Sequence, residues 1–280
     1  MVKYFRNVTA ENIVAPFSFR PLAPYLASFL PFDAETSLNT LNAIAFTISI
    51  LILQQLINGF EIGSRAKNLL LLFFIFSFPA AYYTTVGYLD IWVVLFTMVT
   101  VYLFKYYSLY QALFFYLLLL FICTFLKESV IVSVGFVTAF IYSQRKNLGK
   151  TLIILSAILS IWILANTLTR QVIPVKNVGY SWVPSLKSIE FNLSRPRALP
   201  SLLLSIGAQG FFYSWLVVKK RVPLNSPYFV GFLSFAALWV YSFLTAYANG
   251  RFIWPGMIFS TLGIAHYFSP KKAILINKQN

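Results

Sequence analysis

Two adjacent charged residues interrupt one of the most apolar stretches of this 280-residue sequence. Lys127 and Glu128 lie in FICTFLKESVIVSVGF, within a run from Leu109 to Tyr142 that carries no other charge. A further acid, Asp90, opens the apolar run DIWVVLF. Charged groups inside hydrocarbon are costly unless they pair or reach water. These three side chains are therefore the first candidates for chemistry.

Acids and a cation in apolar surroundings suit acid–base catalysis and the binding of anions. A carboxyl group in an apolar, partly hydrated site can exchange a proton near neutral pH, so we take Asp90 and Glu128 as the candidate catalytic residues. Lys127 is the matching candidate for a contact with phosphate. Two other interpretations remain open: Asp90 caps a helix or joins an ion pair, and Lys127 and Glu128 belong to a buried structural ion network.

Each of the two adjacent charges needs its own partner. Neighbouring positions on a helix point about 100° apart, so Lys127 and Glu128 are not expected to pair with each other. We expect Lys127 to contact Asp90 or a bound phosphate. Glu128 is expected to engage an arginine such as Arg20 or Arg251, or to serve as a second acid.

The composition defines the elements that must position these residues. Hydrophobic residues make up 59% of the sequence and charged residues only 10%, which is more apolar surface than a water-soluble domain of this length could bury. Long apolar runs separated by short basic clusters indicate helices, because the strands of an outer-membrane barrel would alternate apolar with polar residues. The expected fold is an all-α, polytopic bundle of transmembrane helices.

The apolar runs predict about nine transmembrane segments. They lie near residues 39–60, 69–87, 91–104, 109–126, 129–142, 151–168, 199–218, 227–247 and 252–268. The sequence then divides into an outer-face segment, 1–38, a transmembrane bundle, 39–268, and a short tail, 269–280.

The basic residues predict the orientation of the bundle. They gather in the gaps at 61–68, 105–108, 143–150 and 219–226 and in the tail after 268. Short loops rich in lysine and arginine stay in the cytoplasm, so the N-terminus is expected outside and the C-terminus inside. Because the basic residues follow this pattern, no nucleic-acid partner is predicted, and membrane lipid is the expected surrounding.

The three intramembrane charges are expected to lie below the outer surface. About 15 residues separate Asp90 from Lys105, and these cover roughly 22 Å of a hydrocarbon core about 30 Å thick. The same holds from Glu128 to Ser143. The preceding segment, FSFPAAYYTTVGYLD, contains proline, glycine and several polar residues. It predicts a broken helix end that lines a wet pocket.

Two outer segments add basic residues. In APFSFRPLAPYLASFLPF, Arg20 precedes a short helix that is expected to lie on the outer leaflet, with Leu22, Leu26 and Leu30 on one side. The loop 169–200 is basic although it is expected outside.

Its arginines suit recognition of an anion. Arg195 and Arg197, with Arg20 and Arg251, could hold a phosphate or diphosphate, because the guanidinium fork matches phosphate oxygens. Contacts with lipid headgroups or solvent are the alternative for all four, and snorkelling to the interface is a further one for Arg251.

Four short motifs together resemble a known family. FRPLAPYLASFLP, GYLDIWVVLF, LLFICTFLKESV and NGRFIWPGMIF are similar to features of the polytopic type C glycosyltransferases and their bacterial relatives. The resemblance spans roughly residues 15–142 and 245–268. It implies transfer of a sugar from a polyprenyl-phosphate donor on the outer face of a bacterial inner membrane, with an acid activating the acceptor and basic residues holding the lipid phosphate.

The sequence departs from this family at its start. The family's first outer loop normally follows a transmembrane helix and carries an acidic motif, whereas no helix is predicted before this outer segment. A shortened reading frame, a catalytic base located elsewhere, or a relative without transferase activity would each explain the difference. Asp90 is the substitute candidate for the base.

Other functions remain open from the residues alone. A transporter or flippase for a lipid-linked or anionic substrate could use the same cavity without chemistry, and a non-catalytic membrane subunit would need no cavity at all. The only cysteine, Cys123, lies in an apolar run, so no metal site is predicted. No cofactor follows from the residues, and a divalent cation is left open.

Overall fold

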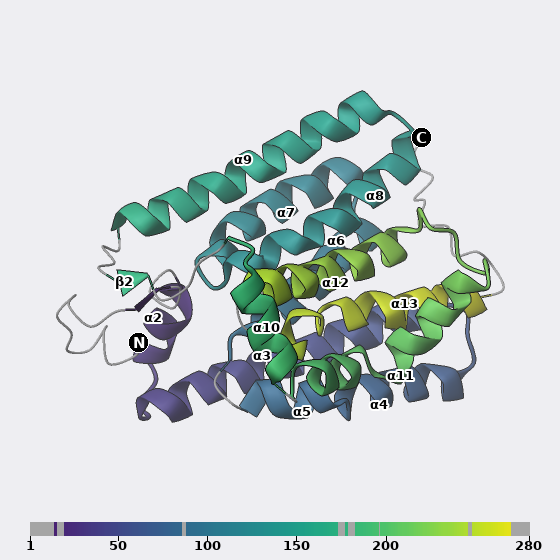
Figure 1. The fold of residues 1–280 in the computed structure, drawn as a ribbon. Helices are drawn as coiled ribbons and strands as arrows, with labels where there is room; N and C mark the ends of the chain where they lie inside the picture. Colours follow the sequence, from purple (N-terminus) through teal and green to yellow (C-terminus); the bar gives the residue numbers. More distant parts are fainter. Residues whose placement is uncertain are drawn as a thin grey trace.

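The computed structural model describes residues 14–15, 20–85, 88–172, 177–178, 183–195, 197–245 and 248–269. These residues form a bundle of helices (Figure 1), in agreement with the predicted all-α fold. The exception among them is a pair of two-residue strands, β1 (Val14–Ala15) and β2 (Asn177–Val178), which run parallel.

Within the described residues, each of the nine predicted apolar segments is largely helical. The elements in chain order are α2 (Leu22–Ser28), α3 (Ala34–Asn58), α4 (Ser64–Ile75), α5 (Phe78–Thr85), α6 (Asp90–Tyr106), α7 (Leu109–Thr124), the 3-10 helix η3 (Glu128–Ser133), α8 (Val134–Arg145), α9 (Leu148–Val172), α10 (Leu186–Ser194), α11 (Ala198–Val218), α12 (Pro227–Thr245), the 3-10 helix η4 (Gly250–Phe252) and α13 (Gly256–Phe268).

The lengths of these helices bear on the number of membrane crossings. Within the described residues, α3, α9, α11 and α12 are long and apolar enough to cross a membrane, and α4 with α5 gives a fifth if the pair, bent by 42°, is one span. The helices α6, α7, α8 and α13 have 17, 16, 12 and 13 residues, fewer than the roughly 20 of a straight span. The chain is therefore an integral membrane protein with a helical bundle, while nine crossings stay a prediction.

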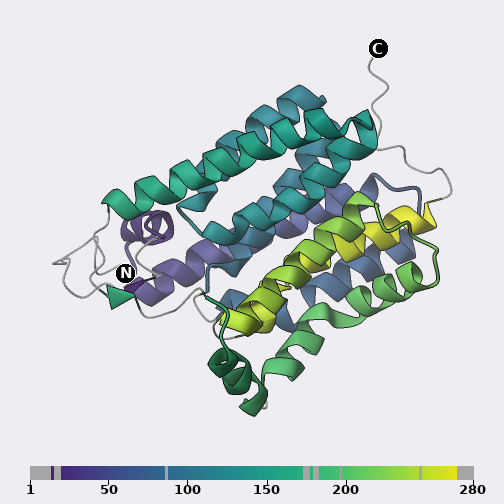
Figure 2. The same ribbon diagram turned by 45° about the horizontal axis from the view of Figure 1, so that its top comes forward.

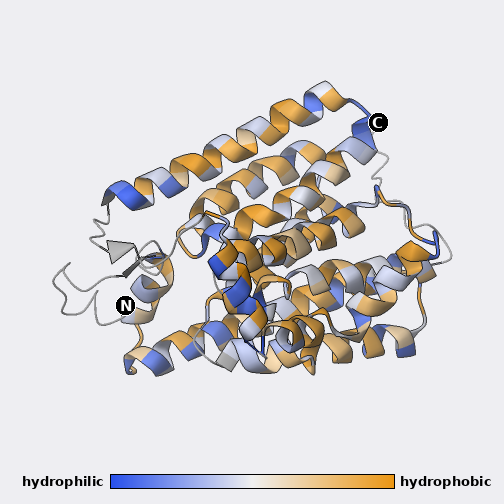
Figure 3. Cartoon of the chain, in the orientation of Figure 1, coloured by the Kyte–Doolittle hydropathy of each residue, from blue (hydrophilic) through white to orange (hydrophobic). Residues whose placement is uncertain are grey.

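The most buried helices are α6 and α13, which are short, whereas the long α9 lies at the edge of the bundle. Every residue of α13 from Gly256 to Ala265 is buried, and Figure 2 shows this helix enclosed by its neighbours. In contrast, α9 lies along one edge in Figures 1 and 2 and is mostly exposed, with apolar side chains such as Ile153 and Ile163 facing outwards. Figure 3 shows hydrophobic colour along most of the helices, as expected for surfaces in contact with lipid.

A helix is present where the outer helix was predicted, as α2, and it packs against the protein through its small residues. Ala23, Pro24 and Ala27 are buried, whereas Leu26 is 37% exposed. The small side chains allow close packing against α3, and the amide of Leu22 donates to the carbonyl of Phe125 at 3.2 Å. The exposed side of α2, which includes Leu26, faces away from the bundle.

The predicted break before Asp90 is also present. Helix α4 ends at Ile75, and α5 begins at Phe78 in a new direction. Ser77 stabilises the start of α5, because its hydroxyl lies 3.4 Å from the amide of Ala80. Residues 86 and 87 of this segment lie outside the described residues.

Candidate functional site

Lys127 owes its position to a break between two helical segments. The sequence predicts Lys127 and Glu128 as neighbours on one helix. Instead, α7 ends at Thr124, and Lys127 has an extended backbone with φ −164° and ψ 123° before η3 begins at Glu128. The amide of Lys127 still donates to the carbonyl of Cys123 at 2.9 Å. The extended conformation, rather than helical rotation, sends the two charged side chains to separate partners.

Lys127 forms a salt bridge with Asp90, which is one of the two partners expected for it. The Lys127 ammonium donates to Oδ1 of Asp90, and both residues are only 2% exposed. Asp90 lies in the first turn of α6, where the positive end of the helix dipole also favours a negative charge. The pair is therefore held in the interior of the protein, away from bulk water.

Glu128 pairs with Arg20, which is also one of its expected partners. Nε of Arg20 donates to Oε2 of Glu128 at 2.9 Å, and a terminal guanidinium nitrogen donates to Oε1 at 2.5 Å. This two-bond geometry is the strong form of an arginine–carboxylate contact. The indole of Trp162 in α9 donates to the backbone carbonyl of Glu128 at 2.9 Å. Three parts of the chain thus meet at this residue: the segment before α2, the start of η3, and α9.

Arg251 is the third cation of this group. Unlike Arg20 and Lys127, it has no carboxylate partner among the described residues. Its guanidinium carbon lies 4.5 Å from the centre of the Tyr88 ring and 5.0 Å from that of Phe252. The Phe252 ring also lies 6.0 Å from the Lys127 ammonium. Among the described residues, the only ion pairs are Arg20–Glu128 and Lys127–Asp90. With three cations and two carboxylates, the group carries a formal charge of +1.

A tight turn connects Arg251 to α5 and α11. The hydroxyl of Tyr83 donates to Oδ1 of Asn249 at 2.5 Å, and the amide of Arg251 also lies 3.2 Å from this oxygen. The amide of Gly250 donates to Oγ of Ser201 at 3.2 Å. A Cβ on Gly250 would lie only 2.0 Å from the carbonyl oxygen of Ser201, so only glycine allows the backbone of η4 to approach α11 this closely.

Several buried polar atoms near this turn have no protein partner. Among the described residues, Oδ2 of Asp90, Oγ of Ser205, Nε of Arg251 and Nε1 of Trp254 make no hydrogen bond of normal geometry. Buried polar groups are nearly always satisfied, so a cluster of unsatisfied ones indicates a place for water or a ligand. These atoms belong to one anionic side chain, one cationic side chain and two neutral ones. Such a set suits a ligand that carries both a charge and hydroxyl groups.

The other two predicted arginines lie on the surface. Arg195 ends α10, is exposed, and stacks over Phe191 with 3.9 Å from its guanidinium carbon to the ring centre. Arg197 is exposed at the start of α11. The bundle places both near the turn, since Asn192 of α10 accepts from the amide of Ala248 at 2.9 Å. Pro196, which lies between them, is outside the described residues.

The structure has a pocket beside the broken helix α4–α5, and the buried charges do not line it. The pocket is lined by residues of α3, α4 and α5. Asp90 and Lys127 are enclosed by protein instead. In the described segments, no group of three or more His, Cys, Asp or Glu side chains could hold a metal ion.

Sequence reasoning missed the serines of α11. Ser201 and Ser205 are four residues apart and so lie on the same face of the helix. A signal was available, because two hydroxyl residues at this spacing in an otherwise apolar helix are typical of contacts with another polar segment. The partner, the turn at Gly250, was not evident from the sequence. No protein-family model, curated protein or solved structure matches this chain.

Proposed function

We propose that this protein is a membrane glycosyltransferase that takes a sugar from a polyprenyl-phosphate donor at the outer end of the bundle. The observation that carries the proposal is the net positive group formed by the buried Asp90 and Lys127 and the half-buried Arg251, with unsatisfied polar atoms beside it. The resemblance of the sequence motifs to type C glycosyltransferases adds the class of donor. The proposal includes nine crossings, with the N-terminus outside and the C-terminus in the cytoplasm.

The charges support an anionic ligand. Arg251 has no carboxylate partner among the described residues, and its Nε is buried without a hydrogen bond. Arg251 is half-buried, and a phosphate would supply both a counterion for its charge and an acceptor for its buried Nε. Lys127 lies close enough to Arg251 to interact electrostatically. The two side chains would hold a phosphate between them.

Asp90 is the proposed general base. Its Oδ1 is bound to Lys127, while Oδ2 is free to accept a proton. In the proposed reaction, the acceptor hydroxyl gives its proton to Oδ2 and its oxygen bonds to the anomeric carbon of the sugar. The bond from that carbon to the phosphate oxygen breaks, and the charge left on the phosphate is stabilised by Arg251 and Lys127.

The remaining predicted residues have supporting roles in this proposal. Glu128 is fully engaged by Arg20, so the pair fixes the segment that carries Lys127, and Glu128 is less suited than Asp90 to act as an acid. Arg195 and Arg197, being exposed at the same end, would meet the donor's phosphate as it enters from the membrane surface. A requirement for a divalent cation stays open.

Binding and turnover of a radiolabelled polyprenyl-phosphate sugar test the proposal. We expect Asp90→Asn to abolish turnover, and Arg251→Gln and Lys127→Ala to weaken binding of the donor. Arg251→Lys should restore part of the binding, because it keeps the charge but not the planar fork. Lys187→Gln is the matched control, since Lys187 is an exposed cation on the neighbouring α10. Each variant is compared with the wild type in detergent at a temperature at which both are folded.

A non-catalytic membrane subunit is the second candidate. It is favoured by the pairing of each carboxylate with a cation, which is what a structural ion network would show. In that case the wild-type protein would bind none of a panel of donors, or would bind one without any turnover. Asp90→Asn would then alter stability alone. Binding with transfer across both leaflets, without chemistry, would indicate a transporter.

A further inference from the structure

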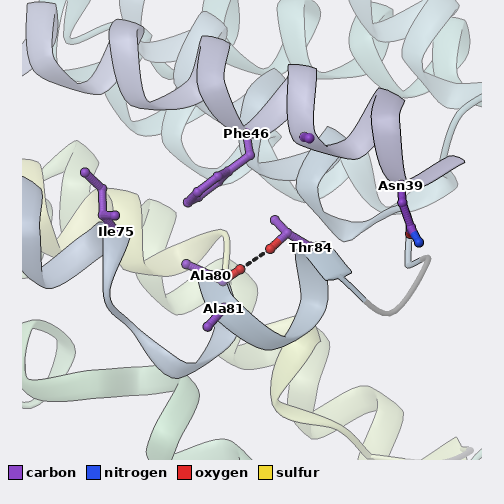
Figure 4. A pocket seen from close by; sticks show the side chains of 7 residues that line it. Asn39, Phe46, Ile75, Ala80, Ala81 and Thr84 are labelled. Carbon is purple, nitrogen blue, oxygen red and sulfur yellow. Dashed lines mark hydrogen bonds between the residues drawn. The ribbon is translucent and has the colours of Figure 1, made fainter. Parts of the chain in front are cut away.

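An apolar pocket of about 400 Å³ lies between α3 and the break of α4 and α5. Figure 4 shows Phe46 between Asn39 on one side and Ile75 on the other, with Ala80 and Ala81 of α5 opposite. Apart from Asn39 and Thr84, every lining residue is apolar. The hydroxyl of Thr84 already donates to the carbonyl of Ala80. The pocket therefore offers almost no hydrogen bonds to water, and an apolar occupant is favoured.

The pocket opens on a surface that faces hydrocarbon. Ala43 and Ala81 of its lining are exposed, and exposed apolar side chains flank it on both helices, including Ile48 on α3 and Phe76 and Phe78 at the break. Because α3 is a candidate membrane span, this surface contacts lipid tails in the membrane. The pocket is continuous with that surface, so the bilayer itself can supply the occupant.

The shape and the polar end of the pocket define the occupant further. Its lining residues on α3 are Asn39, Ala43 and Phe46, which follow one face of the helix over about 10 Å. Oδ1 of Asn39 is buried and has no hydrogen-bond partner among the described residues. Asn39 lies near the start of α3, at the same end of the helix as the exposed cap Asp33. A single polar acceptor near the membrane surface, with an apolar slot below it, matches a lipid.

We propose that this pocket binds one acyl chain of a bilayer phospholipid, with the glycerol end of that lipid beside Asn39. The chain enters between α3 and α5 and fills the space that the 42° bend leaves. The proposal does not depend on the proposed sugar transfer, because none of the charged residues lines the pocket. It predicts a phospholipid that stays with the protein through purification.

Native mass spectrometry of the protein taken from vesicles of phosphatidylethanolamine and phosphatidylglycerol tests the inference. We expect one retained phospholipid per chain in the wild type. Ala43→Phe fills the pocket and should lower the retained fraction at least tenfold. Ile44→Phe is the matched control: it is the next residue on α3, its side chain is 48% exposed, and the substitution should leave retention unchanged.

A second measurement guards against a variant that does not fold. After delipidation, added phospholipid should raise the melting temperature of the wild type and of Ile44→Phe, but not of Ala43→Phe. Ala81→Phe, which fills the pocket from α5, should behave like Ala43→Phe. The inference is overturned if the wild type retains no phospholipid, or if Ala43→Phe and Ala81→Phe both retain phospholipid as the wild type does. It is also overturned if the wild type retains polyprenyl phosphate alone. Loss of donor turnover with normal phospholipid retention would count only against the sugar transfer.

Discussion

At the scale of single residues, the buried charges are the main departure from an apolar bundle. Lys127 and Asp90 are both almost fully enclosed. Removing two ions from water is expensive, and their attraction offsets this cost only while both are present. The two side chains should therefore stabilise the fold only as a pair. This contribution to stability can be measured separately from any role of the pair in binding a ligand.

A double-mutant cycle checks this coupling. Lys127→Met and Asp90→Asn alone should each lower the free energy of unfolding, Lys127→Met by about 3–5 kcal/mol, because it leaves an unpaired carboxylate in the interior. The double variant should be more stable than the sum of the single effects implies. Unfolding in mixed micelles would give the three values. Additive losses would show that the two side chains do not depend on each other.

At the scale of elements, the bundle is shaped by breaks within its helices. Lys127 lies in the break between α7 and η3, and the pocket lies at the break between α4 and α5. A third break is in α11, where Gly207 has φ +62° and ψ 173°. This backbone conformation is accessible almost only to glycine. The break changes the direction of α11, and the half before Gly207, which carries Ser201 and Ser205, packs against the turn at Gly250.

Substitution of Gly207 tests the importance of this break. Gly207→Ala should destabilise the protein by about 1–3 kcal/mol, because alanine is strained at this φ, and its Cβ would approach Cε of Met257 to 3.0 Å. Gly149→Ala in α9 is the control, since its nearest contact would be 3.5 Å away and its backbone is helical. Thermal unfolding in one detergent compares the two. Equal melting temperatures would argue against a requirement for the break.

The start of α3 gives a pH-dependent prediction. Asp33 caps this helix, and hydrogen bonds from the Thr36 hydroxyl and amide hold its pKa below the usual range. A lowered folded-state pKa means that the stabilisation is present above the unfolded pKa and is lost as the pH falls through the folded one. Melting temperature against pH should show this loss in the wild type.

Two variants separate the cap from its charge. Asp33→Asn keeps an acceptor for the amides and should remove the pH-dependent part, whereas Asp33→Ala should lower the melting temperature at neutral pH as well. An acid-dependent loss that persists unchanged in Asp33→Asn would assign the effect to another group.

At the scale of the whole molecule, one end of the bundle carries many basic residues and almost no acidic ones. The cations at one end of the described structure are Arg65, Lys67, Lys105, Arg145, Lys146, Lys150, Lys219, Lys220 and Arg221. Contacts between the loops hold this end together, such as the hydrogen bond of 3.2 Å from the amide of Glu61 to Ser269. Glu61 is the only acid among the described residues there. This asymmetry favours the predicted orientation, with the basic end in the cytoplasm.

Cysteine labelling with an impermeant maleimide tests the orientation. In a Cys123→Ser background, Leu186→Cys on α10 should be labelled in intact spheroplasts, whereas Leu224→Cys between α11 and α12 should react only after permeabilisation. Both leucines are highly exposed, at 83% and 70%, so a difference in labelling reports the side of the membrane. The reverse pattern, or labelling of both from one side, would contradict the predicted topology.

The sequence by itself determined the class of fold and the positions of most apolar helices, because hydrophobicity along the chain is a local property; it did not predict α10, which lies in the segment expected as a polar loop. It also indicated the candidate partners of Lys127 and Glu128, since few opposite charges exist in so apolar a chain. Only the tertiary structure decided among them. Arg20 and Glu128 are 108 positions apart, and Asp90 and Lys127 are 37 apart. The turn at Gly250, the face that α2 buries and the lipid-facing pocket likewise depend on how separate helices pack, which hydropathy along the chain does not specify.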